Sequence, residues 1–291
     1  MAYEFIDQMR DEFPIEVLCK TLEISRSSYY AWRNGKTYQM NYKNMLLEQR
    51  VTAVFWENKR RYGSRRIAAA VQHQGLPLSW YKARKMLKRN GLKAIQPRSF
   101  VPKTTNSRHS YTMSPNLLKQ KKMPCSINEV WVGDITYIPM TSGSFNYLSV
   151  WMDLYSRRIV GWSMMSHMQE SLVIDSLKKA TGSRRIKPGL LVHSDRGGQY
   201  AGNEFRKLLH CCKALQSMND ADNLCDNAFM ESCFSRFKAE LLQGGAFQSA
   251  EDAQIEIGDY IDKYYNPVRL HSPLGYLSPM DYELKLLKDL K

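Results

Sequence analysis

The chain is 291 residues long, enough for two or three domains, and carries a formal net charge of +14 at pH 7. It contains no run of the roughly 20 apolar residues that a membrane span requires. Its first ten residues include Glu4 and Asp7 instead of a basic and then apolar leader. Composition therefore weighs against a membrane or secreted protein and predicts a cytoplasmic one.

The positive charge is confined to the first half of the chain. Residues 1–125 hold 24 lysines and arginines against 8 acidic residues, whereas residues 126–291 hold 18 against 20. Basic side chains that neutralise phosphates release counterions and dominate nucleic-acid affinity. This asymmetry therefore favours binding of a polyanion by the N-terminal half of the chain. A basic surface without any partner would have the same composition.

Residues 14–33 predict two short helices around a tight turn. An apolar-periodic run precedes Ser25, which is a good N-cap for the second helix. In a helix-turn-helix the front of the second helix faces the major groove, and here that front holds Arg26 and Ser28. A plain helical hairpin has a similar pattern. We assign residues 1–40 to this first module.

Residues 41–95 predict a second helical module. Ser79 can cap a helix that runs from Trp80 to Asn90, with Gly91 as the stop signal. Positions 83, 86 and 87 fall on one helix face and can pack, which leaves a basic face for phosphates or for solvent. The first helix of this second module is expected to present an apolar stripe made of Met45, Leu46, Val51, Val54 and Phe55.

Basic side chains in this second module are the candidates for DNA contact, beside Arg26 and Ser28 of the first. They are Arg65, Arg66, Lys82, Lys85, Lys88 and Arg89. Residues 96–125 then turn to Pro, Ser, Thr, Asn and basic residues with little apolar periodicity, and we interpret them as an extended basic linker.

The region from 126 to 245 predicts an α/β core, followed by a C-terminal helical extension over residues 246–291. Segments rich in β-branched and aromatic residues with short breaks between them predict an antiparallel meander of three strands. Three strands, helix, strand, helix, strand and helix is the element order of a ribonuclease-H-like fold. The expected strands are 129–139, 145–154, 158–164, 190–195 and 214–218, and the expected helices are 170–181, 202–212 and 227–242.

Three acidic residues occupy unusual positions in this core. Asp134 lies in the middle of the first strand, where a charge is costly unless it is paired or binds metal. Asp195 ends the fourth strand, and Glu231 lies on the polar face of the last helix, near Lys238. Separately, these acids have ordinary interpretations as a strand-edge cap, a turn residue and a solvated helix position.

Three carboxylates gathered by one sheet would repel one another, so such a site is reasonable only around cations. Oxygen ligands suit Mg²⁺ or Mn²⁺. Two such ions about 3.5–4 Å apart can activate an attacking water or 3′-hydroxyl and stabilise the leaving oxygen in an in-line displacement. Lys238 could orient a phosphate beside them.

Several ordered motifs resemble the second reading-frame product (OrfB) of the IS-three family of insertion-sequence transposases. Asp195 and Glu231 are separated by 35 residues, the spacing of the D-D-35-E signature of retroviral integrases and many bacterial transposases. The similar blocks are Arg61–Ile67 (RYGSRRI), Trp131–Tyr137 (WVGDITY), His193–Tyr200 (HSDRGGQY), Asp226–Ser232 (DNAFMES), Tyr265-Asn266, Arg269-Leu270-His271, Leu274-Gly275-Tyr276 and Ser278-Pro279.

The resemblance implies a ribonuclease-H-like DDE core in which Asp134, Asp195 and Glu231 hold two Mg²⁺ or Mn²⁺ ions. Lys238 matches a position seven residues after the glutamate that commonly carries a basic residue near the DNA end. By the same resemblance, the protein would act on double-stranded terminal-repeat and target DNA in the bacterial nucleoid. It would work as an oligomer, together with or fused to a first-frame protein (OrfA) that carries its own helix-turn-helix.

Two other functions compete with DNA transposition. A catalytically silent DNA-binding regulator derived from a transposase would keep the basic front end, but an intact acidic triad weighs against it. A ribonuclease H acting on RNA–DNA hybrids would share the fold and the metals, but it would not explain the basic front end.

Overall fold

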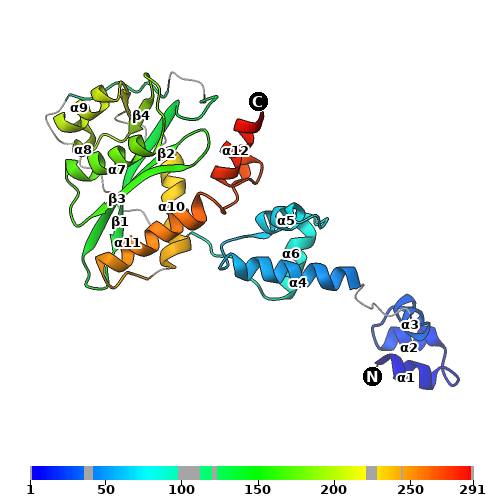
Figure 1. Ribbon diagram of the computed structural model, residues 1–291. Helices are drawn as coiled ribbons and strands as arrows, with labels where there is room; N and C mark the ends of the chain where they lie inside the picture. Colours follow the sequence, from blue (N-terminus) through cyan, green and yellow to red (C-terminus); the bar gives the residue numbers. More distant parts are fainter. Residues whose placement is uncertain are drawn as a thin grey trace.

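The computed structural model describes residues 2–35, 42–97, 112–119, 123–220, 228–243 and 245–289. Figure 1 shows a small N-terminal helical module, a second helical module and an α/β core in chain order. No helix in these described ranges is long and apolar enough to cross a membrane.

The N-terminal module packs three short helices around Ile6, Cys19 and Tyr29. The Ser25 hydroxyl accepts the Ser28 N–H at 3.1 Å, which confirms the predicted cap. The first helix was not predicted, because it buries only Ile6 and so lacks a repeated apolar signal. The helices are α1 (Ala2–Met9), α2 (Ile15–Thr21) and α3 (Arg26–Arg33).

The second module is built from α4 (Tyr42–Glu57), α5 (Ser64–His73) and α6 (Trp80–Arg89). Ser79 caps α6 as predicted, by accepting the Lys82 N–H at 3.2 Å. The predicted packing face of α6 is also confirmed, because positions 83, 86 and 87 are buried. On α4 the predicted stripe was wrong at Met45 and Leu46, which are exposed, because Leu47 is the buried residue there. The spacing of Leu47, Val51 and Val54 brings these three residues onto one helix face.

Five strands form one sheet in the order β3-β2-β1-β4-β5. The first three pair antiparallel, as the short breaks predicted, and β4 and β5 join them in parallel. This mixed topology is that of the ribonuclease-H-like fold. The strands are β1 (Val130–Pro139), β2 (Phe145–Asp153), β3 (Ile159–Met165), β4 (Leu191–Ser194) and β5 (Leu215–Met218).

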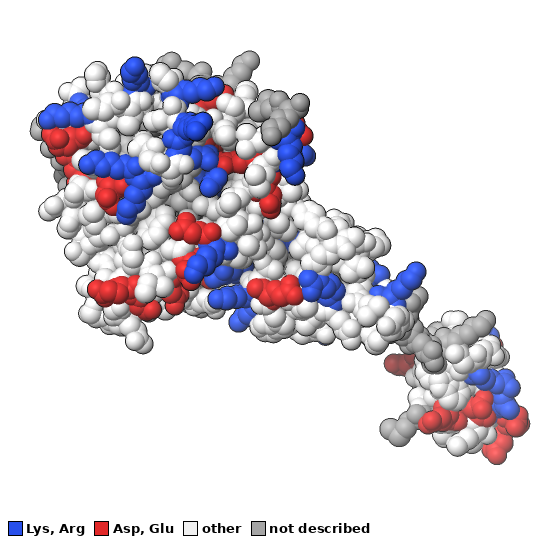
Figure 2. Space-filling model, viewed as in Figure 1, with Lys and Arg blue, Asp and Glu red and all other residues white. Residues whose placement is uncertain are grey.

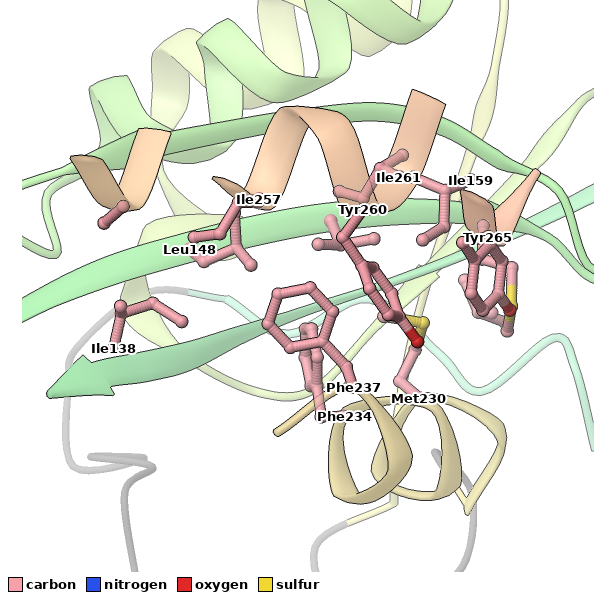
Figure 3. Packing of buried hydrophobic residues seen from close by; sticks show 14 of the residues in the cluster. Ile138, Leu148, Ile159, Met230, Phe234, Phe237, Ile257, Tyr260, Ile261 and Tyr265 are labelled. Atoms are coloured by element: carbon pink, nitrogen blue, oxygen red, sulfur yellow. The ribbon is translucent and has the colours of Figure 1, made fainter. Parts of the chain in front are cut away.

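Helices cover both faces of the sheet. One face packs on Trp151 and Val173, with Phe205 and Tyr200 beside them. It is covered by α7 (Glu170–Ser183), α8 (Gly198–Ala201) and α9 (Asn203–Cys211). The other face packs against α10 (Ala228–Leu242), α11 (Ala250–Gly258) and the π-helix η2 (Asp259–Tyr265), as Figure 3 shows.

The C-terminal segment takes part in the packing of the core. Ile257, Tyr260 and Tyr265 share one buried cluster with Phe234 and Phe237 of α10. The apolar face of this segment therefore lies against the sheet instead of forming a separate body. The chain ends in η3 (Ser272–Leu274) and α12 (Pro279–Asp289).

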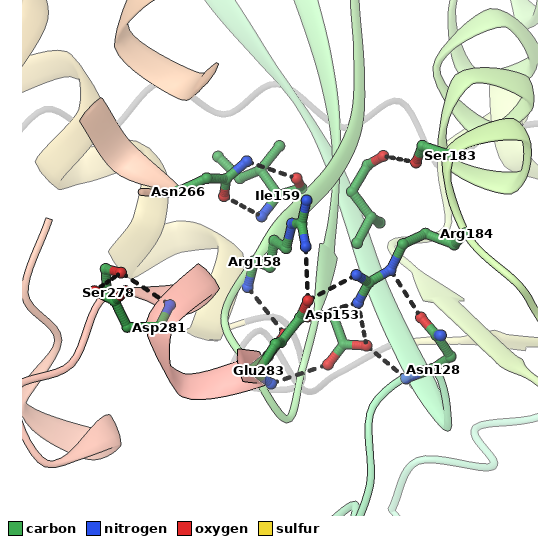
Figure 4. Close-up of polar contacts among 12 residues, drawn as sticks. Asn128, Asp153, Arg158, Ile159, Ser183, Arg184, Asn266, Ser278, Asp281 and Glu283 are labelled. Atoms are coloured by element: carbon green, nitrogen blue, oxygen red, sulfur yellow. Dashed lines mark hydrogen bonds and ion pairs between the residues drawn. The ribbon is translucent and has the colours of Figure 1, made fainter. Parts of the chain in front are cut away.

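A buried carboxylate anchors α12 to the sheet. Glu283 accepts hydrogen bonds from Arg158 at 2.7 Å and from Arg184 at 2.6 and 2.8 Å, and the Ser156 hydroxyl donates to it at 2.7 Å (Figure 4). Burial alone would raise the pKa of Glu283, but these bonds hold it below the usual value of 4.5. The carboxylate is therefore stabilised in its charged form.

We expect Glu283→Gln to lower the free energy of unfolding by about 2 to 3 kcal/mol at neutral pH, because two arginines lose their buried counter-charge. A lowered folded-state pKa stabilises the protein above the unfolded value, and this contribution is lost as pH falls through the folded value. Urea unfolding of wild type and variant should thus differ most above about pH 4.5. Glu256→Gln on the exposed face of α11 is the matched control. An equal loss in both variants would contradict the anchoring role.

Candidate active site

The sheet brings Asp134 and Asp195 side by side. Strands β1 and β4 pair in parallel up to Val132 opposite His193, and each aspartate lies two residues beyond that pair. Side chains alternate along a strand, so residues two apart point to the same face. Val132 belongs to the cluster that packs against α10, and both carboxylates therefore lie on the α10 side of the sheet.

Local hydrogen bonds orient each aspartate. The Ile135 N–H donates to Oδ1 of Asp134 at 2.8 Å, and the Gly197 N–H donates to Oδ1 of Asp195 at 3.1 Å. Asp195 follows the last residue of β4 and begins the turn into α8. A backbone donor fixes one oxygen of each carboxylate, and the sheet holds the Cα atom of Asp134 and the start of the turn at Asp195, so these two aspartates are held in place.

Helix α10 brings Glu231 to the same side. Met230, Phe234 and Phe237 bury the apolar stripe of this helix against the sheet, as predicted. Glu231 itself lies in the first turn and is exposed. The position suits a carboxylate, because the N-terminal turn of a helix carries partial positive charge.

The electrostatics of Asp134 show how the acidic groups are gathered. Burial, and next the Asp195 carboxylate, raise the pKa of Asp134 well above its usual value of 3.8. The Glu231 carboxylate raises it further, whereas the Ile135 N–H and the Lys238 ammonium act in the opposite direction. Both other carboxylates therefore act on Asp134, and their repulsion favours either a proton or a cation at this place.

The donor set fits a hard divalent cation, although its members are not fully converged. Among the described residues, no three acidic, histidine or cysteine side chains are close enough together to hold one ion. Asp134 and Asp195 are neighbours on the sheet, while Glu231 stands on an exposed helical turn. Carboxylate oxygens on an excess of negative charge are the chemistry that Mg²⁺ and Mn²⁺ select.

Lys238 lies partly buried two turns after Glu231 on α10. Burial lowers the pKa of Lys238, and the Asp134 carboxylate opposes that shift. Of the predicted basic residues, Lys238 therefore lies within electrostatic reach of Asp134.

The two candidate DNA contacts in the first module, Arg26 and Ser28, each interact with another residue of that module. Arg26 pairs with Glu16 at 3.3 Å, and the Ser28 hydroxyl bonds to the Ser25 hydroxyl at 2.7 Å. Residues 2–35 hold six acidic against four basic side chains, and Figure 2 shows acidic groups on this module. The positive charge of the first half thus belongs mainly to the second module, where residues 42–97 hold 13 basic against two acidic side chains, and to the sequence of the basic linker after it.

The second module presents its basic residues in different ways. Lys85 and Lys88 are exposed, with Lys85 beside the Tyr81 ring. Arg89 is paired with Glu48, and Lys82 donates to Asn44 at 2.7 Å. Exposed Arg65 lies over the ring of Trp80.

Arg66 has a structural role that the sequence did not reveal. Its Nε donates to the Leu270 carbonyl at 2.8 Å, and Tyr62 both donates to the Val268 carbonyl and accepts the Leu270 N–H. Burial and two neighbouring arginines lower the pKa of Arg66. These bonds join the RYGSRRI block to the C-terminal motif around Leu270, about 200 residues later in the chain.

The sequence did not reveal the structural roles of two further buried residues, Glu240 and His193. Glu240 of α10 forms a buried ion pair with Arg269, with 2.6 Å between Oε1 and the guanidinium, and accepts the Tyr260 hydroxyl at 2.8 Å. His193, buried one strand position before Ser194, bonds to Ser217 Oγ and Asn219 Oδ1. The only sequence signal for either was that Arg269 and His193 stand inside the ordered motifs.

Family models match three segments of the chain. Residues 126–223 and 231–287 match two models described as integrase core domain, and residues 42–100 match an HTH-like domain. Among solved structures, a simian T-cell lymphotropic virus intasome in complex with a PP2A regulatory subunit covers 74% of this chain and 70% of its own, at 17% identity and a TM-score of 0.45.

Curated relatives are insertion-sequence transposases. The transposase for insertion sequence element IS904 of Lactococcus lactis is 40% identical over 82% of this chain and 93% of its own length. Transposase InsF for insertion sequence IS3A of Escherichia coli is 35% identical over 99% of this chain and 100% of its own. Because these matches extend from the helical modules to the last helix, the chain belongs to the IS3 (IS-three) family of insertion-sequence transposases.

Proposed function

We propose that this transposase cleaves and joins DNA strands at its element's ends with Asp134, Asp195 and Glu231 as the ligands of two divalent ions. The observation that carries the proposal is that Asp134 of β1 and Asp195 just after β4 each lie two residues beyond the Val132–His193 pair, together with the raised pKa of Asp134. Relatives named as transposases support the reaction class.

The protein groups divide the work at this site. Asp134 and Asp195 supply oxygens from the rigid sheet, and Glu231 supplies them from the first turn of α10. When bound, Mg²⁺ or Mn²⁺ would supply charge that activates the attacking oxygen and stabilises the leaving one. Lys238 lies where its ammonium can hold a DNA phosphate near the acids. Water would be the attacking group in cleavage, and a freed 3′-hydroxyl in strand transfer.

We assign DNA capture chiefly to the second module and the basic linker. Residues 42–97 have a net charge of +11, so their contact with the phosphate backbone should be strong and dependent on salt. The first module, with its acidic surface, is assigned a smaller share than its helix-turn-helix layout suggests. We also propose that the chain acts on DNA as an oligomer, together with a first-frame partner protein.

Replacing Lys85 and Lys88 together with alanine should weaken binding to all DNA sequences alike and reduce the slope of log affinity against log salt by about 2. Both side chains are exposed on α6, and phosphate contacts carry no sequence information. Fluorescence anisotropy on terminal-repeat and scrambled duplexes over a salt series measures the effect. The control is Arg26→Ala in the first module. A larger loss for the control, or a change confined to the terminal repeat, would contradict this assignment.

The direct test of the proposed reaction is cleavage of a labelled terminal-repeat duplex with Mg²⁺ or Mn²⁺, using the chain alone and joined to its first-frame protein. Production of a 3′-hydroxyl at the element boundary and its transfer into a second duplex are expected. Binding without any metal-dependent cleavage in either form would overturn the proposal.

A further inference from the structure

A cavity lies between the second module and α10, apart from the acidic site. Its volume is about 140 Å³, several times the roughly 30 Å³ that one water occupies in the liquid. Arginines from both sides line it. We call it the arginine cavity and define it by Arg61 just before α5, Arg66 in the first turn of α5, and Arg236 of α10. The remaining lining residues are Gly63, Ala94, Ile95, Gln96, Pro97, Ala239 and Glu240.

None of the three arginines has an ion-pair partner among the described residues. Arg61 lies over the Tyr264 ring, at 4.4 Å, and its buried Nε has no hydrogen-bond acceptor in the described part of the chain. Arg66 uses its Nε on a backbone carbonyl, and the Glu240 carboxylate, which also faces Arg269, only partly offsets the shift that burial and two arginines impose on its pKa. Arg61 and Arg66 are half-buried, and a partly desolvated guanidinium that lacks an ion-pair partner is costly, so the cavity favours an anion.

The one acid in the lining does not supply that counter-charge. Both Glu240 oxygens are already engaged, by the Arg269 guanidinium and by the Tyr260 hydroxyl. Arg269 and Glu240 neutralise each other, and three positive charges remain around the cavity. Guanidinium groups in such an arrangement suit an anion with several oxygens in fixed geometry, as in a phosphate group.

We propose that the arginine cavity binds one backbone phosphate of the transposon-end duplex and so joins the second module and α10 on the same DNA. The inference rests on the proposed function and adds a contact separate from the acidic site. Arg236 follows Glu231 by five residues, or about 7.5 Å along the helix axis at 1.5 Å per residue. A phosphate held at Arg236 therefore fixes the DNA strand relative to the helix that carries Glu231.

Arg236→Gln tests this inference, because Arg236 is exposed and its loss should leave the fold intact. The control is Arg185→Gln, which removes one exposed positive charge from the core away from the cavity. Binding of the full chain to a terminal-repeat duplex is measured in EDTA over a salt series, so that catalysis plays no part. The salt slope should fall by about 1 for Arg236→Gln and stay unchanged for the control.

A second measurement identifies the phosphate. Uncharged methylphosphonates are placed one at a time along each strand of the duplex. Wild type should lose affinity severalfold at one position, and Arg236→Gln should lose nothing further at that position, because the variant and the modification remove the same contact. Arg185→Gln should retain the wild-type pattern.

The outcomes separate the possible sources of the anion. Equal salt slopes and equal methylphosphonate patterns for wild type and Arg236→Gln would overturn the inference while leaving the proposed reaction intact. If inorganic phosphate at constant ionic strength raised the melting temperature of wild type but not of Arg236→Gln, with DNA binding unaffected, the cavity would be a small-anion site and the DNA assignment would be wrong. Absence of DNA binding by wild type itself would instead count against the proposed function.

Discussion

Asp195→Asn is expected to abolish both strand cleavage and strand transfer while leaving binding to terminal-repeat DNA nearly intact. The amide keeps the size and the hydrogen bond from the Gly197 N–H but removes the charge that holds a divalent ion. Asp134→Asn and Glu231→Gln should behave alike. The loss should reach at least the roughly 10²–10³-fold typical of removing one group that stabilises a developing charge.

The measurement is cleavage and joining of a labelled element end, with DNA affinity and melting temperature recorded for each variant. Asp134→Asn should not lower the melting temperature, because the raised pKa of Asp134 shows that its charge is disfavoured in the protein without metal. Substantial cleavage by any of the three variants would show that its carboxylate is not a metal ligand. Loss of activity that followed loss of folding would not support the assignment either.

The choice of control acids depends on the tertiary structure. Asp222 and Asp226 are close to Glu231 in the sequence but lie outside the described residues, so neither is chosen as a control. Glu240 on the same helix as Glu231 is unsuitable because it is buried in an ion pair. Glu251, exposed at the start of α11, serves instead, and Glu251→Gln should keep full activity.

Glu240→Gln should lower the free energy of unfolding by about 3 to 5 kcal/mol, more than Glu283→Gln, because it leaves the buried Arg269 guanidinium without its counter-charge. The hydrogen bonds from Arg269 hold the pKa of Glu240 below its usual value despite burial. For a protein of this size the melting temperature should fall by on the order of 10 °C. Urea unfolding and thermal melting measure the two quantities.

A double variant separates lost charge pairing from lost packing. Glu240→Leu combined with Arg269→Met removes both charges at similar volume, and it should recover more than half of the stability lost by Glu240→Gln. Glu251→Gln again provides the exposed control. If the double variant were less stable than Glu240→Gln, the cost would come from packing or from the unpaired Tyr260 hydroxyl instead of the buried charge.

The sequence alone predicted the order and type of the core elements because their signals are local. Alternation of β-branched residues, short breaks and the apolar stripe around Phe234 are each determined within a few residues of the chain. The three acids could be selected for the same reason, since each stands in an ordered block. Their assignment as metal ligands remains a proposal that the Asp195→Asn experiment addresses.

Only the tertiary structure decided which charged residues serve the fold and which stay available for DNA. Arg66 and Lys85 are both basic residues on predicted helices, yet Arg66 donates to a carbonyl from the other end of the chain while Lys85 remains exposed. Glu240 likewise acquires its role from Arg269, 29 residues later. A buried charge must find its partner wherever the chain packs, and that partner is set by long-range packing, which no local pattern contains.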